Sequence, residues 1–321
     1  VPRGAPRPGS LWGRRVIPAP ADDIRRFDAG AFDPRQLATA KARLACTVSV
    51  CLPARDEAAT VGAIVEVNRA ELVQTHGLVD ELVVVDDHST DATAAAAAEA
   101  GARVVDARTT LTDHGVGPGK GGALWKGLHA CSGDLVVFCD ADVRDFSTGF
   151  VTGLVGPLLT HPDVAFVKGF YERPLDGEPH GGGRVTELVA RPVLSLLFPH
   201  LATVVQPLSG EYAGRRALLE KLPFVNGYGV DLGLLVDIAE TAGPASIAQV
   251  DLGVRHHRNR PLHELAPQAA AVLATALRRA DPELVGTLSA LVRPDGPHPP
   301  VDVSERPPLC EVHGSVDGAD R

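Results

Sequence analysis

The chain has 321 residues, of which 45% are hydrophobic and 22% are charged. This composition is close to that of ordinary globular proteins, and it excludes a fully disordered or collagen-like chain. With 31 Lys and Arg against 40 Asp and Glu, the net charge is −9. We therefore expect no nucleic acid as a bulk partner, because the field of the whole protein repels polyanions.

The cysteine pattern bears on the cellular compartment. Cys46, Cys51, Cys131, Cys139 and Cys310 are odd in number and contain no Cys-x-x-Cys pair, so neither a disulfide framework nor a zinc knuckle is indicated. No apolar run approaches the roughly 20 residues that cross a bilayer, and the N-terminus lacks the apolar core of a signal peptide. These features predict a cytoplasmic protein with reduced thiols and no transmembrane segment.

Four short apolar runs are predicted to be β-strands. They cover residues 47–53, 81–87, 103–105 and 134–139. Helix-forming sequence lies between successive runs, beginning at Thr60 after the first, and residues 88–91 can cap the Ala-rich helix after the second. Nearly continuous apolar strands joined by helices predict an α/β fold, with a mostly parallel central sheet flanked by helices.

Two aspartates, Asp140 and Asp142, directly follow the fourth apolar run. Because side chains alternate along an extended chain, both carboxylates are expected to point to the same side, with Ala141 between them. Such a pair can hold Mg²⁺, which completes its coordination with water and the phosphate oxygens of a sugar nucleotide. The alternative is that the two aspartates cap a loop or the start of a helix.

A glycine-rich stretch, residues 115–122, contains Lys120 and precedes a predicted helix. It could cradle a phosphate, because glycines let the backbone approach closely and Lys120 adds a positive charge. It is not a Walker loop, since His114 stands where that motif needs its first glycine and Gly121 where it needs Ser or Thr. A flexible turn before a helix is the alternative.

Two segments of the second half could bind anions. Arg184 and Thr186 follow Gly181–Gly183 at the start of a predicted helix, where free N–H groups, a guanidinium and a hydroxyl converge. Residues 255–260 combine three arginines with His256 and His257 at an expected strand end, and imidazole can also bind a metal. A glycine hinge and a solvated basic loop are the respective alternatives.

Taken together, these segments resemble a GT-A glycosyltransferase, and they are most similar to the glucosyl-3-phosphoglycerate synthases, retaining glycosyltransferases of family 81. The resemblance runs from about residue 46 to about residue 265. The motifs shared with many GT-A enzymes are Leu52–Glu57, Val85–Asp91 and Asp140–Asp142. The more specific segments are Pro118–Gly121, Gly182–Pro192, Gln206–Tyr212, Gly227–Val230 and His257–Arg260.

The resemblance implies a GT-A fold with a C-terminal acceptor-binding portion. The implied organisation is an N-terminal extension (1–45), a sugar-nucleotide-binding half (46–150), an acceptor-binding half (151–262), and a C-terminal helix at about 264–280 within a final segment (263–321). The Pro-rich composition of that segment's tail predicts an extended or mobile chain.

The resemblance also assigns residues to the donor, the metal and the acceptor. The donor UDP-glucose would be bound by Pro53, Ala54, Arg55 and Glu57 around the uridine and ribose, by Asp86 or Ser89 near the base, by Lys120, and by Asp140 and Ala141. Asp142 and His257 would coordinate Mg²⁺, Mn²⁺ or Co²⁺, and Asp231 would complete the catalytic set. The acceptor 3-phosphoglycerate would be held by Gly183, Arg184, Thr186, Leu208, Tyr228 and Asn259.

The implied reaction transfers glucose from UDP-glucose to the 2-hydroxyl of 3-phosphoglycerate with retention of configuration, in a protein that forms homodimers. The product would be a precursor of glucosylglycerate or of methylglucose lipopolysaccharide. No residue stands out as an enzymic nucleophile, so the leaving phosphate is expected to accept the proton, with electrostatic stabilisation from the metal.

Several positions depart from the family pattern. Ala141 stands where the family usually has serine, Asp56 where it favours asparagine, and Arg55 where it has an apolar residue. These differences bear on nucleotide affinity or base selectivity. Asp231 replaces a glutamate near the sugar and is one methylene shorter, which bears on the choice of donor sugar.

Three other functions remain open. A mannosyl-3-phosphoglycerate synthase would use GDP-mannose and keep the same acceptor pocket. A GT-A transferase could act on a lipid phosphate or a polysaccharide at a membrane, although the expected lack of membrane helices argues against it. A sugar-nucleotide sensor without catalysis is the third alternative, and the intact aspartate pair and His257 argue against it.

Overall fold

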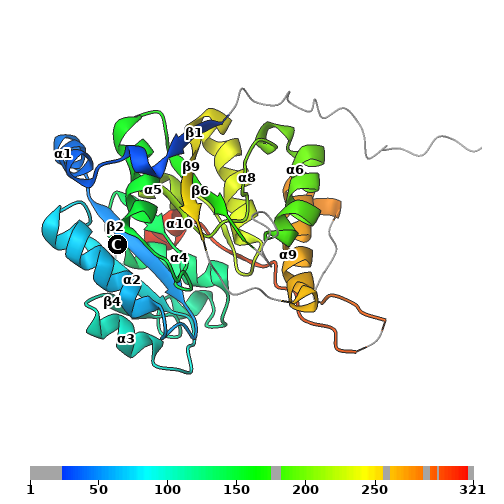
Figure 1. The fold of residues 1–321 in the computed structure, drawn as a ribbon. Coiled ribbons are helices and arrows are strands. Elements are labelled where there is room, and N and C mark those ends of the chain that lie inside the picture. Colours follow the sequence, from blue (N-terminus) through cyan, green and yellow to red (C-terminus); the bar gives the residue numbers. More distant parts are fainter. Residues whose placement is uncertain (1–23, 175–181, 256–260, 285–289, 295, 317–321) are drawn as a thin grey trace, which may run out of the picture.

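The computed structural model describes residues 24–174, 182–255, 261–284, 290–294 and 296–316. Within them, an eight-stranded sheet forms the centre of the molecule, in the order β1-β9-β6-β7-β5-β2-β3-β4 (Figure 1). Its strands are β1 (Arg25–Asp28), β2 (Val48–Ala54), β3 (Glu81–Asp86), β4 (Arg103–Asp106), β5 (Leu135–Phe138), β6 (Phe166–Glu172), β7 (Tyr212–Arg215) and β9 (Ile247–Val254). A separate antiparallel pair joins β8 (Phe224–Val225) to β10 (Glu305–Arg306).

The sheet is mostly parallel, as the sequence predicts. β7 alone among the eight strands runs antiparallel to its neighbours, β5 and β6. The four strands predicted from apolar runs are β2, β3, β4 and β5, and these pair in parallel in the order β5-β2-β3-β4. The α/β fold class is therefore confirmed.

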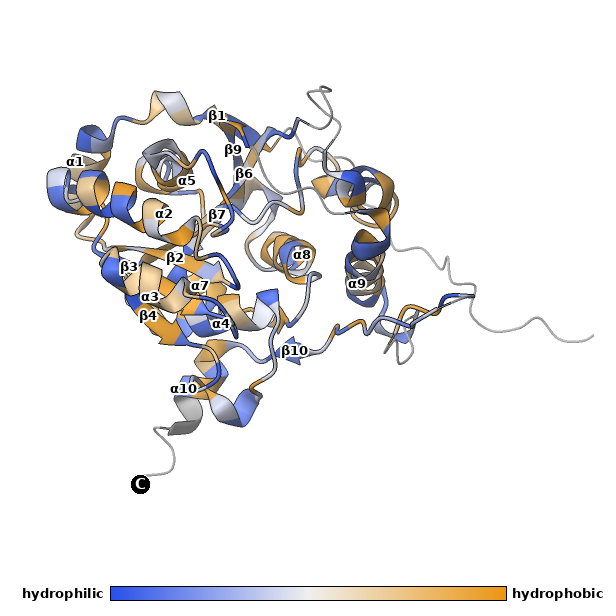
Figure 2. Ribbon diagram, turned by 60° about the horizontal axis from the view of Figure 1, so that its bottom comes forward, coloured by the Kyte–Doolittle hydropathy of each residue, from blue (hydrophilic) through white to orange (hydrophobic). Residues whose placement is uncertain are grey.

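Helices cover both faces of the sheet. They are α1 (Pro34–Leu44), α2 (Val61–Val67), α3 (Thr93–Glu99), α4 (Lys120–Ala130), α5 (Thr148–Thr160), α6 (Arg191–Leu197), α7 (Arg216–Leu219), α8 (Val230–Ala242), α9 (Leu262–Ala280) and α10 (Leu309–Val316). Wider turns over Asn68–Thr75 extend α2, and similar turns over Thr186–Ala190 lead into α6. Figure 2 shows α2 and α4 on opposite sides of β2. No helix in the described ranges is long and apolar enough to cross a membrane.

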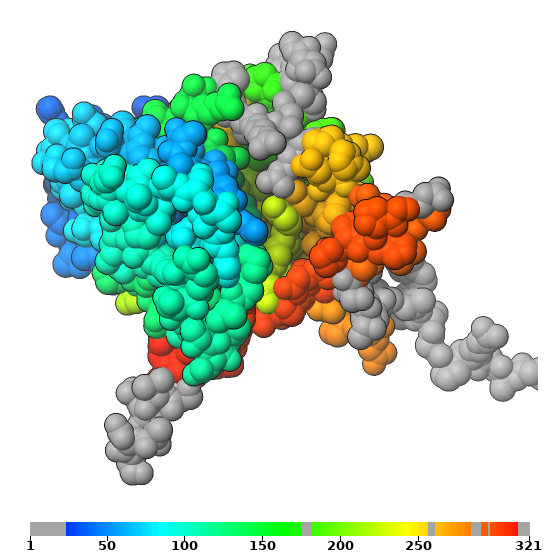
Figure 3. All heavy atoms as spheres, turned by 90° about the horizontal axis from the view of Figure 1, so that it is seen from below, coloured from blue at the N-terminus to red at the C-terminus, as the bar shows by residue number. Residues whose placement is uncertain are grey.

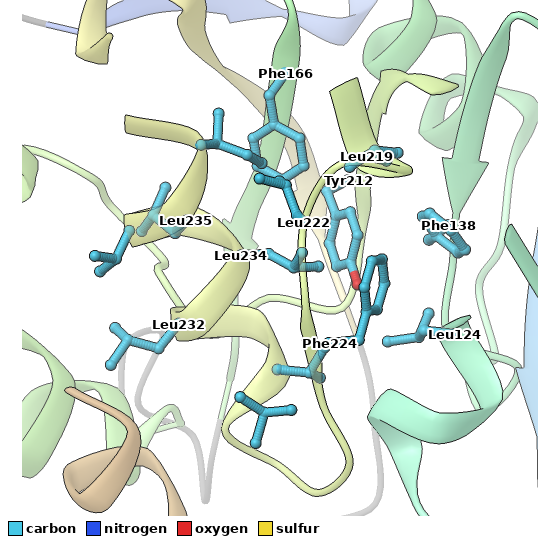
Figure 4. Close-up of a cluster of buried hydrophobic side chains, with 14 of the residues drawn as sticks. Leu124, Phe138, Phe166, Tyr212, Leu219, Leu222, Phe224, Leu232, Leu234 and Leu235 are labelled. Atoms are coloured by element: carbon cyan, nitrogen blue, oxygen red, sulfur yellow. The ribbon is translucent and has the colours of Figure 1, made fainter. Parts of the chain in front are cut away.

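The two faces of the central strands carry separate hydrophobic cores. Alternation along β3 sends Val83 and Val85 into one core and Leu82 and Val84 into the other. The first core lies beneath α4 and α8, and Figure 4 shows the rings of Phe138, Tyr212 and Phe166 within it. The Tyr212 ring centroid lies 5.3 Å from that of Phe138 and 5.5 Å from that of Phe166. Burial on both faces explains why these strands read as continuous apolar runs.

Local capping sets where several helices begin. Asp33 accepts hydrogen bonds from the backbone N–H groups of Arg35 and Gln36 at the start of α1, where Pro34 occupies the first turn. At the Ala-rich helix α3, Asp91 accepts a hydrogen bond from the Thr93 N–H at 2.9 Å. The predicted capping function of residues 88–91 therefore belongs to Asp91.

The predicted divisions at residues 45 and 150 both fall within one sheet. The N-terminal extension contributes β1, which pairs in parallel with β9 from Arg25 opposite Ala248 to Asp28 opposite Asp251. The second half contributes β6, β7 and β9 to the same sheet. The segments before and after residue 150 are thus joined by backbone hydrogen bonds within one sheet.

The described part of the C-terminal tail, which is expected to be extended or mobile, packs against the body. β10 pairs with β8, and α10 contributes Leu309, fully buried, to the first core. Trp125 Nε1 on α4 donates a hydrogen bond to the backbone oxygen of Pro307 at 2.8 Å. Although the tail is Pro-rich, it contains a few apolar residues. Val301 and Val303 are among them, and both are buried against α9. Those residues supply the burial that a mobile tail would lack.

Glu81 links three segments at the amino end of the central strands. Its carboxylate accepts hydrogen bonds from the Ser49 hydroxyl at 2.5 Å, from the Ser132 backbone N–H at 2.5 Å and from Arg103 at 2.8 Å. Burial alone would raise the pKa of Glu81, but these donors stabilise the ionised form and hold the pKa at about 2.

We expect Glu81→Gln to lower the free energy of unfolding at pH 7 by about 1–3 kcal/mol, the usual range for hydrogen bonds to a charged group. Because the folded-state pKa is depressed, this stabilisation is present above the unfolded value of 4.5 and is lost as the pH falls toward 2. Urea denaturation at pH 7 and pH 3.5 measures it, and the difference between wild type and variant should shrink at the lower pH. Exposed Glu99→Gln is the control, and equal stability of Glu81→Gln and Glu99→Gln at pH 7 would contradict this account.

Candidate active site

The loops that follow β2, β3 and β5 meet at the carboxyl edge of the sheet, where ligands bind in open α/β folds. Figure 3 shows a hollow on this part of the molecule, between the blue-green half and the yellow-orange α9. Two adjoining cavities occupy the region, one of about 470 Å³ and one of about 190 Å³. They share Lys120, Asp140, Asp142, Tyr228 and Gln268, so the predicted aspartate pair lies where the two cavities meet.

The larger cavity collects most of the predicted donor residues. Those that line it are Pro53, Ala54, Arg55, Glu57, Lys120, Asp140, Ala141 and Asp142. Burial, together with the negative charge of Asp142, raises the pKa of Glu57 to about 7. The volume of the larger cavity falls within the roughly 300–1,000 Å³ typical of small-molecule sites. This cavity suits an extended ligand such as a nucleotide.

Asp86 and Ser89, which are expected near the base, are joined to each other and to the loop after β2 by hydrogen bonds. Asp86 is buried and accepts a hydrogen bond from the Ser89 N–H at 3.1 Å, while the Ser89 hydroxyl accepts one from the Asp56 N–H at 3.0 Å. Among the described lining residues of the two cavities, Asp87 is present, whereas Asp86 and Ser89 are absent. These contacts clamp the loop after β2 to the loop after β3.

The smaller cavity collects the predicted acceptor residues. It is lined by Gly183, Arg184, Thr186, Leu208, Tyr228 and Asp231. A helical segment begins at Arg184, directly after Gly183, whose φ of +75° favours glycine. Backbone N–H groups at a helix start and a guanidinium suit a small anion. His257 and Asn259 lie outside the described residues.

The glycine-rich stretch before α4 is shaped by a close backbone approach. Gly121 and Gly122 donate backbone hydrogen bonds to the Asn226 oxygen at 2.8 and 3.2 Å. A Cβ atom on Gly121 would lie 1.6 Å from the Val225 oxygen, so no side chain fits there. Gly119 donates to Asp87 at 3.0 Å. These contacts place Lys120 at the first turn of α4, facing both cavities.

Two cations, Lys120 and Arg255, form ion pairs with carboxylates at the junction of the cavities. Lys120 Nζ lies 3.1 Å from Asp231 Oδ2 and 3.3 Å from Asp140 Oδ1. Arg255 Nη2 lies 2.5 Å from Asp142 Oδ1 and 3.2 Å from Asp140 Oδ2. That one guanidinium nitrogen reaches both Asp140 and Asp142 confirms that the two carboxylates point to the same side.

Arg255 also holds a deeper carboxylate. Its Nη1 lies 2.8 Å from Glu211 Oε1, and it donates a hydrogen bond to the Tyr171 hydroxyl at 2.6 Å. The side chains of Arg255 and Glu211 are 4% and 0% exposed, so this ion pair is shielded from water. Burial alone would raise the pKa of Asp140, but Lys120 and Arg255 hold it well below its ordinary value. Asp140 is therefore ionised.

The aspartate pair fits a divalent cation. Carboxylate oxygens are the ligands that Mg²⁺ and Mn²⁺ prefer, and the Asp142 side chain is 37% exposed at the cavity wall. No group of three or more potential His, Cys, Asp or Glu ligands occurs among the described residues. Substrate oxygens, water and His257 would have to complete the coordination.

Some cavity residues were not predicted from the sequence. Arg255 belonged to a run recognised only as basic, and Glu211 lay in a family-specific segment without an assigned function. Gln268 of α9 faces both cavities, and Pro300, Val301 and Asp302 of the tail line the larger one. Nothing in the local sequence around Gln268 or residues 300–302 signals a site, because only the fold brings them there.

We expect Arg255→Met to lower the free energy of unfolding by about 3–5 kcal/mol, because it leaves Glu211 buried without a partner charge. The double variant Arg255→Met/Glu211→Gln should recover part of that loss. Urea denaturation at pH 7 measures both. A surface control is Arg191→Met, whose partner Glu187 is exposed and whose effect should stay below about 1 kcal/mol. A double variant no more stable than Arg255→Met would contradict the charge-balance explanation.

The chain resembles known proteins in sequence. The glycosyl transferase family 2 model matches residues 49–222. The chain is 45% identical to glucosyl-3-phosphoglycerate synthase of Petrotoga mobilis over 260 residues, covering 79% of this chain and 80% of that protein. It is 53% identical to the protein of the same name from Mycolicibacterium smegmatis over 237 residues, covering 73% and 77%.

Two solved structures are similar over most of their length. One is glucosyl-3-phosphoglycerate synthase from Mycobacterium tuberculosis in complex with Mn²⁺, UDP-glucose and phosphoglyceric acid, at a TM-score of 0.81 and 45% identity over 90% of this chain and 99% of that one. The other is mannosyl-3-phosphoglycerate synthase from Rubrobacter xylanophilus, at a TM-score of 0.82 and 39% identity over 90% and 97%.

Proposed function

This chain belongs to the glucosyl-3-phosphoglycerate synthases, and on that premise we propose that it transfers glucose from UDP-glucose to the 2-hydroxyl of 3-phosphoglycerate with retention. The enzyme is a metal-dependent glycosyltransferase with UDP-glucose as donor and 3-phosphoglycerate as acceptor. The 2-hydroxyl and the stereochemical outcome are our proposal.

The observation that carries this function is the junction of the two cavities at Asp140 and Asp142. A nucleotide diphosphate in the larger cavity and a small phosphorylated acid in the smaller one would both reach this point. The reacting sugar carbon and the acceptor hydroxyl would then be held side by side, which removes much of the entropic cost of their encounter.

We propose that the donor is bound by Pro53, Ala54, Arg55, Glu57, Lys120, Asp140 and Ala141. Lys120 lines this cavity and would contact the diphosphate through its Nζ, which also lies near Asp140 and Asp231. Asp86 and Ser89 contribute by fixing the loop after β2. A divalent cation, held by Asp142 and His257, supplies Lewis-acid stabilisation of negative charge on the departing UDP.

We propose that Asp231 binds a hydroxyl of the donor sugar. Its Oδ2 faces Lys120, while its buried Oδ1 has no hydrogen-bond partner in the described part of the chain. A buried acceptor without a partner costs free energy, and a sugar hydroxyl in the cavity would offset that cost. Asp231, which we propose selects the sugar, is therefore also ion-paired with Lys120.

The acceptor phosphate and carboxylate are proposed to bind Gly183, Arg184, Thr186 and Asn259, with Leu208 and Tyr228 closing the smaller cavity. No side chain is assigned as a nucleophile. The proton of the acceptor hydroxyl passes to an oxygen of the departing phosphate, which keeps charge and atoms balanced in the transfer.

A homodimer in the cytoplasm is also proposed. The helical segment 186–197 exposes Leu188 and Leu196, which are 72% and 71% exposed, and an apolar face of this kind supports contact with a second copy. Free thiols support a reducing compartment, since Cys51, Cys131 and Cys139 are all buried and unpaired.

Mannosyl transfer from GDP-mannose is the second candidate function. The observation that favours it is the likeness to the mannosyl-3-phosphoglycerate synthase of Rubrobacter xylanophilus, whose TM-score of 0.82 is as high as that of the glucosyl enzyme. The higher sequence identity to glucosyl-3-phosphoglycerate synthases, 45–53% against 39%, favours the first candidate.

The test is nucleotide release from purified protein with Mn²⁺, using UDP-glucose or GDP-mannose with and without 3-phosphoglycerate. We expect UDP release to require 3-phosphoglycerate and to exceed GDP release at least tenfold. Predominant GDP release would move the chain to the mannosyl function, and release independent of the acceptor would contradict the acceptor site.

Asp142→Asn provides the matched variant for this assay. It keeps the shape of the side chain and removes the charge, so kcat/KM should fall by about 10²–10³, the usual loss when an electrostatic partner of the transition state is removed. The unfolding midpoint should stay close to that of wild type. Asp113→Asn, on an exposed residue outside both cavities, should leave kcat/KM unchanged.

A further inference from the structure

The C-terminal tail runs along the larger cavity at some distance in sequence from every predicted site residue. After α9, the chain returns past β8 to α10, as the orange-to-red segment in Figures 1 and 3 shows. Residues 300–306 of this return, which we call the strap, bring Pro300, Val301 and Asp302 into the cavity lining. The lining of the cavity that we assign to the nucleotide thus includes tail residues.

The strap is fixed to the body on its α9 side. Val301 and Val303 are 5% and 4% exposed and pack against Ala271 and Ala274 of α9. Arg278 donates a hydrogen bond to the Val303 backbone oxygen at 2.7 Å. Two buried valines and a charged hydrogen bond hold the strap in one position, so its contribution to the cavity wall is built into the fold.

The strap is also bonded to the loop between β8 and α8. The Asn226 N–H donates to the Ser304 backbone oxygen at 2.8 Å, and the Asn226 side-chain amide donates to the Ser304 hydroxyl at 2.7 Å. Ser304 in turn donates to Asp302 from its N–H at 2.8 Å and from its hydroxyl at 2.6 Å. Ser304 therefore links the cavity-lining Asp302 to Asn226.

Asn226 connects the strap to the start of α4 through hydrogen bonds. Its backbone oxygen accepts the hydrogen bonds from Gly121 and Gly122 that fix the turn carrying Lys120. Tyr228, two residues further along, lines both cavities. One continuous set of hydrogen bonds therefore runs from Asp302 through Ser304 and Asn226 to the Lys120 turn.

We propose that the strap is part of the donor site: Pro300–Asp302 form one wall of the nucleotide cavity, and Ser304 is a positioning residue that keeps Asn226 and the Lys120 turn in register with that wall. This inference rests on the proposed function, since it assumes that the larger cavity takes the nucleotide. It assigns the tail an effect that falls mainly on donor binding, because Pro300, Val301 and Asp302 line the larger cavity and not the smaller one.

The positioning part is tested by Ser304→Ala and its conservative partner Ser304→Thr. Dissociation constants for UDP and for GDP are measured by calorimetry with Mn²⁺, alongside KM for 3-phosphoglycerate and the unfolding midpoint. We expect Ser304→Ala to weaken nucleotide binding about three- to tenfold, as the loss of one or two hydrogen bonds would do. Ser304→Thr keeps the hydroxyl and should bind nucleotide within twofold of wild type.

The wall part is tested by Pro300→Trp, which places a large side chain on the cavity lining without removing any backbone donor, since proline has none. Nucleotide binding should weaken more than tenfold. Pro297→Trp adds the same bulk to an exposed position of the same tail that does not line the described cavities, and it should bind nucleotide like wild type.

These measurements test the proposal about the strap and the proposed function separately. Unchanged nucleotide binding in both Ser304→Ala and Pro300→Trp would overturn the strap while leaving acceptor-dependent turnover of the wild type as evidence for the function. An equal loss of nucleotide and 3-phosphoglycerate affinity would also overturn it. Wild type that binds a nucleotide but shows no turnover, with variants responding as expected, would support the strap and refute the function. Wild type that binds neither nucleotide would overturn both.

Discussion

The buried ion pair between Arg255 and Glu211 is the interaction on which the site depends. Four carboxylates, those of Asp140, Asp142, Glu211 and Asp231, come together at the carboxyl edge of the sheet. Like charges at this depth repel strongly, and burial adds a desolvation cost for each of them. Arg255, with Lys120, offsets both effects. The two cations hold the pKa of Asp140 well below its ordinary value, so this carboxylate is ionised beside the cavities, where a cation can bind it.

The remaining features of the site serve to hold these two cations in place. Gly210 must lack a side chain, because a Cβ atom there would lie 2.3 Å from Asp140 Oδ1. Gly121 must lack one because of the Val225 backbone, and this close approach sets the turn that carries Lys120. Glycines that suggest a phosphate cradle in the sequence thus also have a packing function. Both close contacts fix the backbone beside the charged groups, and electrostatic stabilisation of a transition state relies on groups that are held in place in this way.

The sequence predicts those parts of the structure that depend on local pattern. The apolar runs of β2 to β5 are visible because both faces of these strands are buried, and the aspartate pair is visible because it ends one of them. The contacts that the sequence does not reveal join distant segments. β1 pairs with β9 more than 200 residues later, β7 inserts antiparallel between β5 and β6, and Arg255 meets Glu211 across the sheet. Val301 and Val303 lie in a Pro-rich segment, and the local sequence does not indicate that they pack against α9. The expectation that Asp86 or Ser89 lies near the base stays a prediction, and the sequence alone does not indicate that Asp87, directly after β3, lines the larger cavity.

The central claim is that Asp140 and Asp142 are already engaged in ion pairs, both with Arg255 and Asp140 also with Lys120, so that the aspartates hold a divalent cation well only together with a diphosphate. The most direct measurement is a calorimetric titration of Mn²⁺ into the protein with and without saturating UDP. The charge balance predicts weak Mn²⁺ binding to the protein alone and binding at least tenfold tighter with UDP present. Equally tight Mn²⁺ binding in the absence of UDP would contradict it.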